Sequence, residues 1–231
     1  MTNRIFKAML CTLALWASVC GAMQLNSQHA IVVKDGTKEV LYEKDQNAVV
    51  PIASLTKLMT AMVVLDSHPD MNAQITIQSE DVDTLKHSRS YVPVGTTLPR
   101  REILRLALMS SDNRAAAALA RTFPGGHAGF VRAVEEKIRA LKMTHTVIKE
   151  PTGLSPDNTS TASDLASMAI AASQYPDIVH ITTDRSTSIT MNGRARVVNN
   201  TNKLVGARGW DVLLSKTGFT NEAGRCLIMR I

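Results

Sequence analysis

The stretch "PIASLTKLMT", residues 51–60, places two polar side chains within an apolar helical pattern. Its apolar side chains are typical of a protein core: Ile52, Leu58 and Met59. On a helix, Ser54 and Lys57 lie one turn apart on the same face. A lysine among apolar neighbours either extends its ammonium to solvent or takes part in chemistry. The stretch therefore predicts a buried helix, from Ser54 to about Ser67, with a serine–lysine pair at its start.

The composition is that of a packed globular protein. The chain has 231 residues, of which 45% are hydrophobic and 20% are charged, so it suits one domain of ordinary size. Its net charge is +6, but the cations are dispersed, which makes a nucleic-acid surface a poor interpretation. A mildly basic exterior favours the approach of an anionic polymer.

The first 22 residues are typical of a secretory signal. Two cations precede an uncharged apolar run over residues 8–22, and Ala22 suits cleavage after it. The run is too short for a membrane anchor, and Val19 is a poor residue before a lipidated Cys20. We therefore predict a signal peptide over 1–22, export to the periplasm, and a catalytic domain over 23–231.

The remaining pattern predicts an α/β fold of the α+β type. Residues 30–44 alternate around Asp35-Gly36, which indicates a β-hairpin. Helical spacing then dominates the middle of the chain, and strand patterns return from Ile189. We expect an antiparallel sheet in which the two ends of the chain meet, packed against helices.

Three polar islands interrupt the apolar segments. They are Ser54-Leu55-Thr56-Lys57 at a helix start, Ser111-Asp112-Asn113 between two helices, and Lys216-Thr217-Gly218 on a strand. Each alone is weak: the first also fits a helix cap with a solvent-reaching lysine, the second a turn, and the third an exposed strand end. Their occurrence in this order, each in a fitting local structure, favours a shared catalytic role.

In this order the islands resemble the signature of the penicillin-recognising serine acyltransferases, which include DD-peptidases and serine β-lactamases. Further segments are similar to the periplasmic D-alanyl-D-alanine endopeptidases of the penicillin-binding protein 7 type: "LRLALMSSDNRAAAALA", "EPTGLS", "STASDL", "NNTNKLV" and "SKTGFTNEAGRCLIM". The resemblance implies a DD-peptidase/β-lactamase-like fold, in which an antiparallel sheet carries a helical subdomain.

The resemblance also implies roles for the islands. Ser54 would be the nucleophile, Lys57 its base, and Ser111 a proton relay to the leaving amine. Lys57 would act as a base because burial and the neighbouring cation of Lys216 lower its pKa.

The implied substrate-binding residues are Asn113, Lys216, Thr217, Gly218 and Phe219. The backbone N–H groups of Ser54 and Phe219 would form an oxyanion hole, and Lys216 and Thr217 would bind the substrate carboxylate. Gly218 would let the substrate backbone lie against the strand.

The implied function is hydrolysis of D-alanyl cross-links in peptidoglycan through an acyl-enzyme on Ser54, with β-lactams as covalent inhibitors. A D-alanyl-D-alanine carboxypeptidase, a serine β-lactamase and an inactive wall-binding remnant remain as alternatives. The β-lactamase is disfavoured because Glu150, in "KEPTGLS", lacks a deacylation motif and is interpreted as a structural ion-pair partner. Neither a cofactor nor a metal site is expected, nucleic acid is not an expected partner, and peripheral membrane association and oligomeric state stay open.

The chain ends at Ile231, directly after "GRCLIMRI". The resemblance implies a further strand and a long helix beyond this point, so we expect a C-terminally truncated domain. The missing strand would lie between the N-terminal hairpin and the strand that carries Cys226, which predicts two unpaired strand edges.

Overall fold

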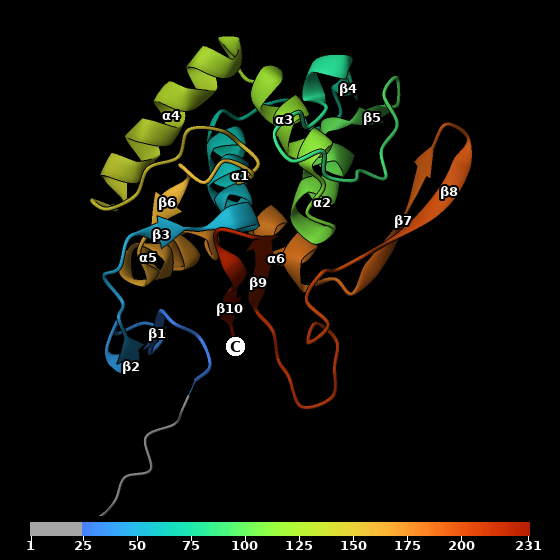
Figure 1. Cartoon of the computed structure of the whole chain (residues 1–231). Coiled ribbons are helices and arrows are strands. Elements are labelled where there is room, and N and C mark those ends of the chain that lie inside the picture. Colours follow the sequence, from blue (N-terminus) through green and yellow to red (C-terminus); the bar gives the residue numbers. More distant parts are fainter. Residues whose placement is uncertain (1–24) are drawn as a thin grey trace, which may run out of the picture.

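The computed structural model describes residues 25–231 (Figure 1). The predicted signal peptide, residues 1–22, lies outside this range. Within 25–231, no helix combines the length and the apolar character that a membrane crossing requires.

Six α-helices supply most of the core of the described chain. They are α1 (Thr56–Asp66), α2 (Arg100–Met109), α3 (Asn113–Arg121), α4 (Gly126–Ala140), α5 (Ala162–Ala172) and α6 (Pro176–Thr183). Helix α1 contacts each of the other five, and Figure 1 shows it between α4 and the α2–α3 pair. Its side chains are buried from Thr56 to Val64, as expected of a helix that has no solvent face. The predicted buried helix is confirmed.

The strands of the described chain form five antiparallel pairs. They are β1 (Ala30–Val33) with β2 (Val40–Lys44), β3 (Val50–Pro51) with β6 (Thr159–Ser160), β4 (Gln74–Thr76) with β5 (Thr97–Pro99), β7 (Ser186–Met191) with β8 (Arg194–Asn199), and β9 (Leu214–Thr220) with β10 (Gly224–Arg230). Two short 3₁₀ turns, η1 (Ala53–Leu55) and η2 (Ser79–Asp81), complete the elements. The predicted hairpin around Asp35-Gly36 is confirmed by the β1–β2 pair.

The antiparallel pairing and the packing against helices confirm the predicted fold class, but the strands do not join into one sheet. Within residues 25–231, β1–β2 and β9–β10 share no ladder; the two ends of the chain meet through α5, which contacts both β1 and β10, and through the ion pair of Arg230 with Asp35 at 2.6 Å.

Helix α6 was not predicted. Its sequence, "PDIVHITT", begins with Pro176 at the first helical position, where proline is well tolerated. The segment contains three β-branched residue types, which lower helix propensity, so its pattern is not distinctive. Burial of Ile178, Ile181 and Thr182 stabilises it as a helix beneath β9.

Candidate active site

Ser54 lies in η1, the 3₁₀ turn that leads into α1. The residue before it, Ala53, has a φ of +47°, a left-handed conformation that is costly for a residue with a Cβ. The loop containing Gly153 packs directly on this turn, since a Cβ on Gly153 would lie 1.9 Å from the Ala53 carbonyl oxygen. A glycine at position 153 is therefore required for the loop to hold the strained turn in place.

Lys57 is the largest polar side chain in the core and is only 1% exposed. Its Nζ lies 2.9 Å from Ser54 Oγ, 2.7 Å from Asn113 Oδ1 and 2.6 Å from the Thr152 carbonyl oxygen. The last two oxygens can only accept hydrogen bonds, whereas a hydroxyl can also donate. A neutral amine has two N–H groups and one lone pair, so this geometry directs the lone pair toward the Ser54 hydroxyl.

Burial lowers the pKa of Lys57 to about 8, against the opposing effect of three carboxylates, Glu150, Asp112 and Asp83. With that pKa, about one amine in ten is uncharged at pH 7. The neutral form is therefore accessible at neutral pH, but it is the minority form. The cost of reaching it is about 1.4 kcal/mol.

Ser111 and Lys216 form a second hydrogen-bonded pair. Lys216, also 1% exposed, donates from Nζ to Ser111 Oγ at 2.9 Å and to the Thr217 carbonyl oxygen at 2.7 Å. Burial and the repulsion of Lys57 lower the pKa of Lys216. The predicted electrostatic coupling of the two lysines thus acts on Lys216, while burial accounts for the lowered pKa of Lys57.

Ser111 has a φ of +58°, a conformation that few non-glycine residues adopt. It lies in the sharp turn between α2 and α3, where Asp112 caps α3 by accepting a hydrogen bond from the Ala115 N–H at 3.0 Å. The turn places Ser111 toward Lys216, while Asn113, the first residue of α3, contacts Lys57. A strained turn at a polar cluster is typical of a functional site.

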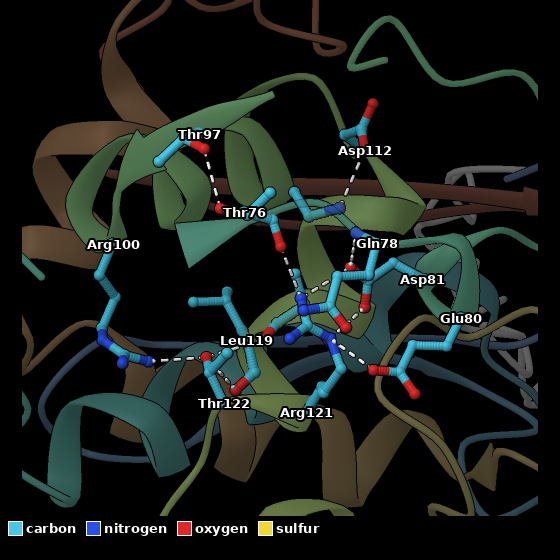
Figure 2. Close-up of polar contacts among 12 residues, drawn as sticks. Thr76, Gln78, Glu80, Asp81, Thr97, Arg100, Asp112, Leu119, Arg121 and Thr122 are labelled. Carbon is cyan, nitrogen blue, oxygen red and sulfur yellow. Dashed lines mark hydrogen bonds and ion pairs between the residues drawn. The ribbon is translucent and has the colours of Figure 1, made fainter. Parts of the chain in front are cut away.

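The other end of α3 is held by Arg121. Figure 2 shows its guanidinium between Asp81, Glu80 and the Thr76 carbonyl. It donates to both carboxylate oxygens of Asp81 at 2.9 Å and to the Thr76 oxygen at 2.8 Å. Because the Asp81 side chain is 1% exposed, this bidentate pair fixes the helix that carries Asn113.

Strand β9 carries the third island beside the start of α1. A Cβ on Gly218 would lie 3.0 Å from the Ser54 backbone nitrogen and 3.1 Å from Ala53 Cβ. Gly218 therefore lets β9 approach the serine turn closely; the substrate contact expected of it stays a prediction. Phe219, the next residue, is 63% exposed, and Thr217 Oγ1 contacts Thr201 Oγ1 at 2.5 Å.

Glu150 is structural, but not through the expected ion pair. Within the described chain, its carboxylate accepts hydrogen bonds from the Thr152 N–H at 2.7 Å, the Thr152 hydroxyl at 2.6 Å, the Gly153 N–H at 2.6 Å and Asn158 Nδ2 at 3.0 Å. It organises the loop that supplies the Thr152 carbonyl to Lys57.

Among the contacts of the site with residues outside the predicted islands, two involve Lys57 and Asn113 directly. The Thr152 carbonyl could not be predicted, because a backbone acceptor carries no side-chain signal. The second is Ser88, whose hydroxyl accepts from Asn113 Nδ2 at 2.7 Å. The only hint of it in the sequence is the polar, turn-rich character of residues 70–98. A cavity of about 520 Å³ lies alongside, lined in part by Asn113 and Thr152.

The serine–lysine pair has the arrangement expected of a serine hydrolase in which a lysine takes the place usually held by histidine. Residues 17–231 match the family Peptidase_S11, described as D-alanyl-D-alanine carboxypeptidase, and the chain belongs to this family. The predicted family resemblance and enzyme class are confirmed.

Two curated relatives are D-alanyl-D-alanine endopeptidases. The protein from Pseudomonas aeruginosa is 45% identical over 90% of this chain and 67% of its own length. The protein from Escherichia coli is 41% identical over 93% of this chain and 70% of its own length.

Solved structures support the same fold. The crystal structure of a Streptomyces DD-transpeptidase aligns with a TM-score of 0.82 at 25% identity, covering 89% of this chain and 85% of that one. The D-alanyl-D-alanine carboxypeptidase of Mycobacterium tuberculosis aligns with a TM-score of 0.76 at 27% identity, covering 91% and 86%. The predicted DD-peptidase-like fold is confirmed.

Proposed function

We propose that this protein is a serine DD-endopeptidase that hydrolyses D-alanyl cross-links of peptidoglycan, with Ser54 as nucleophile. The observation that carries the proposal is the buried Lys57 amine, whose N–H groups are engaged by Asn113 and Thr152 so that its lone pair faces Ser54. This is the geometry required to activate a serine hydroxyl.

In the proposed acylation, the Ser54 oxygen attacks the carbonyl carbon of the D-alanine residue that precedes the scissile bond. The hydroxyl proton of Ser54 moves to Lys57. The negative charge that develops on the carbonyl oxygen is stabilised by the backbone N–H groups of Ser54 and Phe219. The C–N bond then breaks, and Ser111, hydrogen-bonded to Lys216, donates its hydroxyl proton to the departing amine and is reprotonated by the proton that Lys57 took from Ser54, so that Lys57 is neutral again in the acyl-enzyme. Water hydrolyses the resulting ester and restores Ser54.

The remaining predicted residues bind the substrate in this proposal. Lys216 and Thr217 hold a free carboxylate beside the scissile bond through charge-assisted hydrogen bonds. Asn113, at the start of α3, holds a peptide group and also lines the neighbouring cavity. That cavity offers space for the remainder of a branched peptide.

Endopeptidase action is favoured over carboxypeptidase action by the names of the relatives at 45% and 41% identity. Carboxypeptidase action is the second candidate, because the family description names it. The location that fits either activity is the periplasm, reached through the signal predicted over residues 1–22.

Digestion of purified sacculi tests the proposal. Incubation with the wild-type protein is expected to convert cross-linked dimer muropeptides into monomers, while Ser54→Ala leaves the dimers intact. Release of free D-alanine from pentapeptides with no loss of dimers would instead assign the carboxypeptidase. If neither product formed and Ser54 took no label from a fluorescent penicillin, the enzymatic proposal would be wrong.

A further inference from the structure

The Asn113 carboxamide is hydrogen-bonded at both ends, and the two partners differ in kind. Its Oδ1 accepts from Lys57 Nζ at 2.7 Å, and its Nδ2 donates to Ser88 Oγ at 2.7 Å. A carboxamide can rotate by half a turn and exchange these two ends with little change in shape. Ser88, the partner on the side away from Lys57, therefore determines whether Oδ1 or Nδ2 of Asn113 faces Lys57.

Ser88 is itself held beside Asp83. Its backbone N–H donates to Asp83 Oδ2 at 2.7 Å, which fixes the residue next to this carboxylate. Burial works to raise the pKa of Asp83, but hydrogen bonds from Ser88, Lys86 and Leu85 hold it below its usual value. An ionised carboxylate only accepts hydrogen bonds and therefore cannot orient a hydroxyl lone pair toward itself, so Asp83 favours the orientation in which the Ser88 oxygen accepts from Asn113 Nδ2.

The orientation of Asn113 determines what the Lys57 lone pair can do. With Oδ1 facing Lys57, the two N–H groups of the neutral amine are taken up by Asn113 and the Thr152 carbonyl. With the carboxamide reversed, an N–H of Asn113 would point at Lys57 and compete with the Ser54 hydroxyl for the same lone pair.

We propose that Ser88, held by Asp83, is a positioning residue that fixes the orientation of the Asn113 carboxamide and thereby directs the Lys57 lone pair to Ser54. The inference rests on the proposed function and extends it to a loop outside the three islands. A chain of three contacts carries it, from Asp83 through Ser88 and Asn113 to Lys57.

The test is the acylation of Ser54 by a fluorescent penicillin, with the saturating rate constant k2 measured separately from the dissociation constant of the non-covalent complex. Ser88→Ala is expected to lower k2 about tenfold, the effect of losing one oriented hydrogen bond, while the dissociation constant stays within about threefold. Ser88→Thr keeps the hydroxyl and is expected to recover most of the rate. Ser79→Ala, an exposed serine in η2, is the matched control and is expected to match the wild type.

The pH profile separates positioning from loss of structure. The charged groups around the Lys57 amine are Glu150, Asp112, Asp83 and Lys216, and Ser88→Ala leaves all four in place. Without Ser88, the Asn113 carboxamide is no longer fixed with Oδ1 toward Lys57, so the Lys57 ammonium loses a hydrogen-bond acceptor. This loss disfavours the charged form of Lys57 and lowers its pKa. The rise of the second-order acylation constant is therefore expected to move to lower pH, even as k2 falls.

A Ser88→Ala protein with wild-type k2 and an unshifted profile would overturn the inference while leaving the proposed function intact. So would a Ser88→Thr protein as slow as Ser88→Ala. If Ser88→Ala does not fold, as judged by its melting transition, Asp83→Asn decides in the same way: wild-type k2 overturns the inference, and a tenfold loss supports it. Absence of any Ser54 label on the wild type would overturn both the inference and the proposed function.

Discussion

At the scale of single residues, the proposed site depends on a buried lysine, Lys57, that can still lose its proton and act as a base. Burial removes the hydration of the Lys57 ammonium, and three oxygen partners compensate for only part of that loss, so the charged form is destabilised. The resulting pKa of about 8 is close to neutral pH, where a general base combines adequate basicity with an accessible unprotonated form.

The first prediction concerns pH. Because Lys57 must lose a proton before it can accept one from Ser54, the second-order constant for acylation of the wild type should rise about tenfold per pH unit below pH 8 and level off above it. Stopped-flow measurements with a fluorescent penicillin between pH 6 and 9.5 would show this. A flat profile across the range would contradict a base with this pKa.

The second prediction concerns Gly218. The methyl group of Gly218→Ala would press on the Ser54 nitrogen and Ala53 Cβ, and a shift of a few tenths of an ångström should slow acylation by at least about tenfold. Gly129→Ala, in α4 and outside the site, is the matched control, since its Cβ would lie 2.1 Å from the Pro124 carbonyl oxygen just before that helix. That control should lower the melting temperature more than Gly218→Ala does. Wild-type acylation by Gly218→Ala would show that the close approach of β9 is unimportant.

At the scale of elements, α3 links the site to the outer part of the helical region. Its first turn presents Asn113 to Lys57, and its last residue, Arg121, binds the buried Asp81 (Figure 2). A buried carboxylate without its partner is costly, so the position of the helix along its own axis is well determined.

The third prediction follows from this clamp. Arg121→Met leaves Asp81 buried and unpaired, and should lower the free energy of unfolding by about 3 kcal/mol. Glu80→Gln is the control, because Glu80 is exposed and contacts the same guanidinium at 3.4 Å; its effect should stay within about 0.5 kcal/mol. Urea titrations of both variants measure the difference. Equal, small losses would mean that Arg121 is not a clamp.

The loop that contains Glu150 leads to the fourth prediction. Four hydrogen-bond donors within about 3 Å occupy the Glu150 carboxylate, so it lacks a free lone pair to activate water. A penicilloyl group on Ser54 should therefore be released slowly, over many minutes. Gel fluorescence after a chase with unlabelled drug measures the release, and rapid turnover of a chromogenic β-lactam would overturn the prediction.

The elements were largely predictable from the sequence, because most of them have strong periodicity or strong boundary signals. Thr161 carries such a boundary signal: a threonine three residues before an aspartate is typical of a helix start, and its side chain accepts a hydrogen bond from the Asp164 N–H. Helix α6 was missed because tertiary burial, rather than propensity, stabilises it.

At the scale of the whole molecule, the candidate site lies where segments distant in the chain converge. Turn η1 contacts both β9 and β10, and the hydrogen bonds of Lys57 reach residues 56 and 95 positions away. The side chains of the three islands could be predicted from their residue types and order. The carbonyl of Thr152, the orientation of Ser88 and the strain at Ala53 could not, since they arise only when these segments pack together.

The saturated carboxylate of Glu150 also bears on how such a protein responds to a drug. If the penicilloyl group stays on Ser54 for longer than the experiment, each protein molecule reacts with one antibiotic molecule and is then inactive. The amount of penicillin needed for complete inhibition would then equal the amount of protein, mole for mole, and would not depend on an equilibrium constant. Penicillin could then be used as a titrant to measure the concentration of active protein.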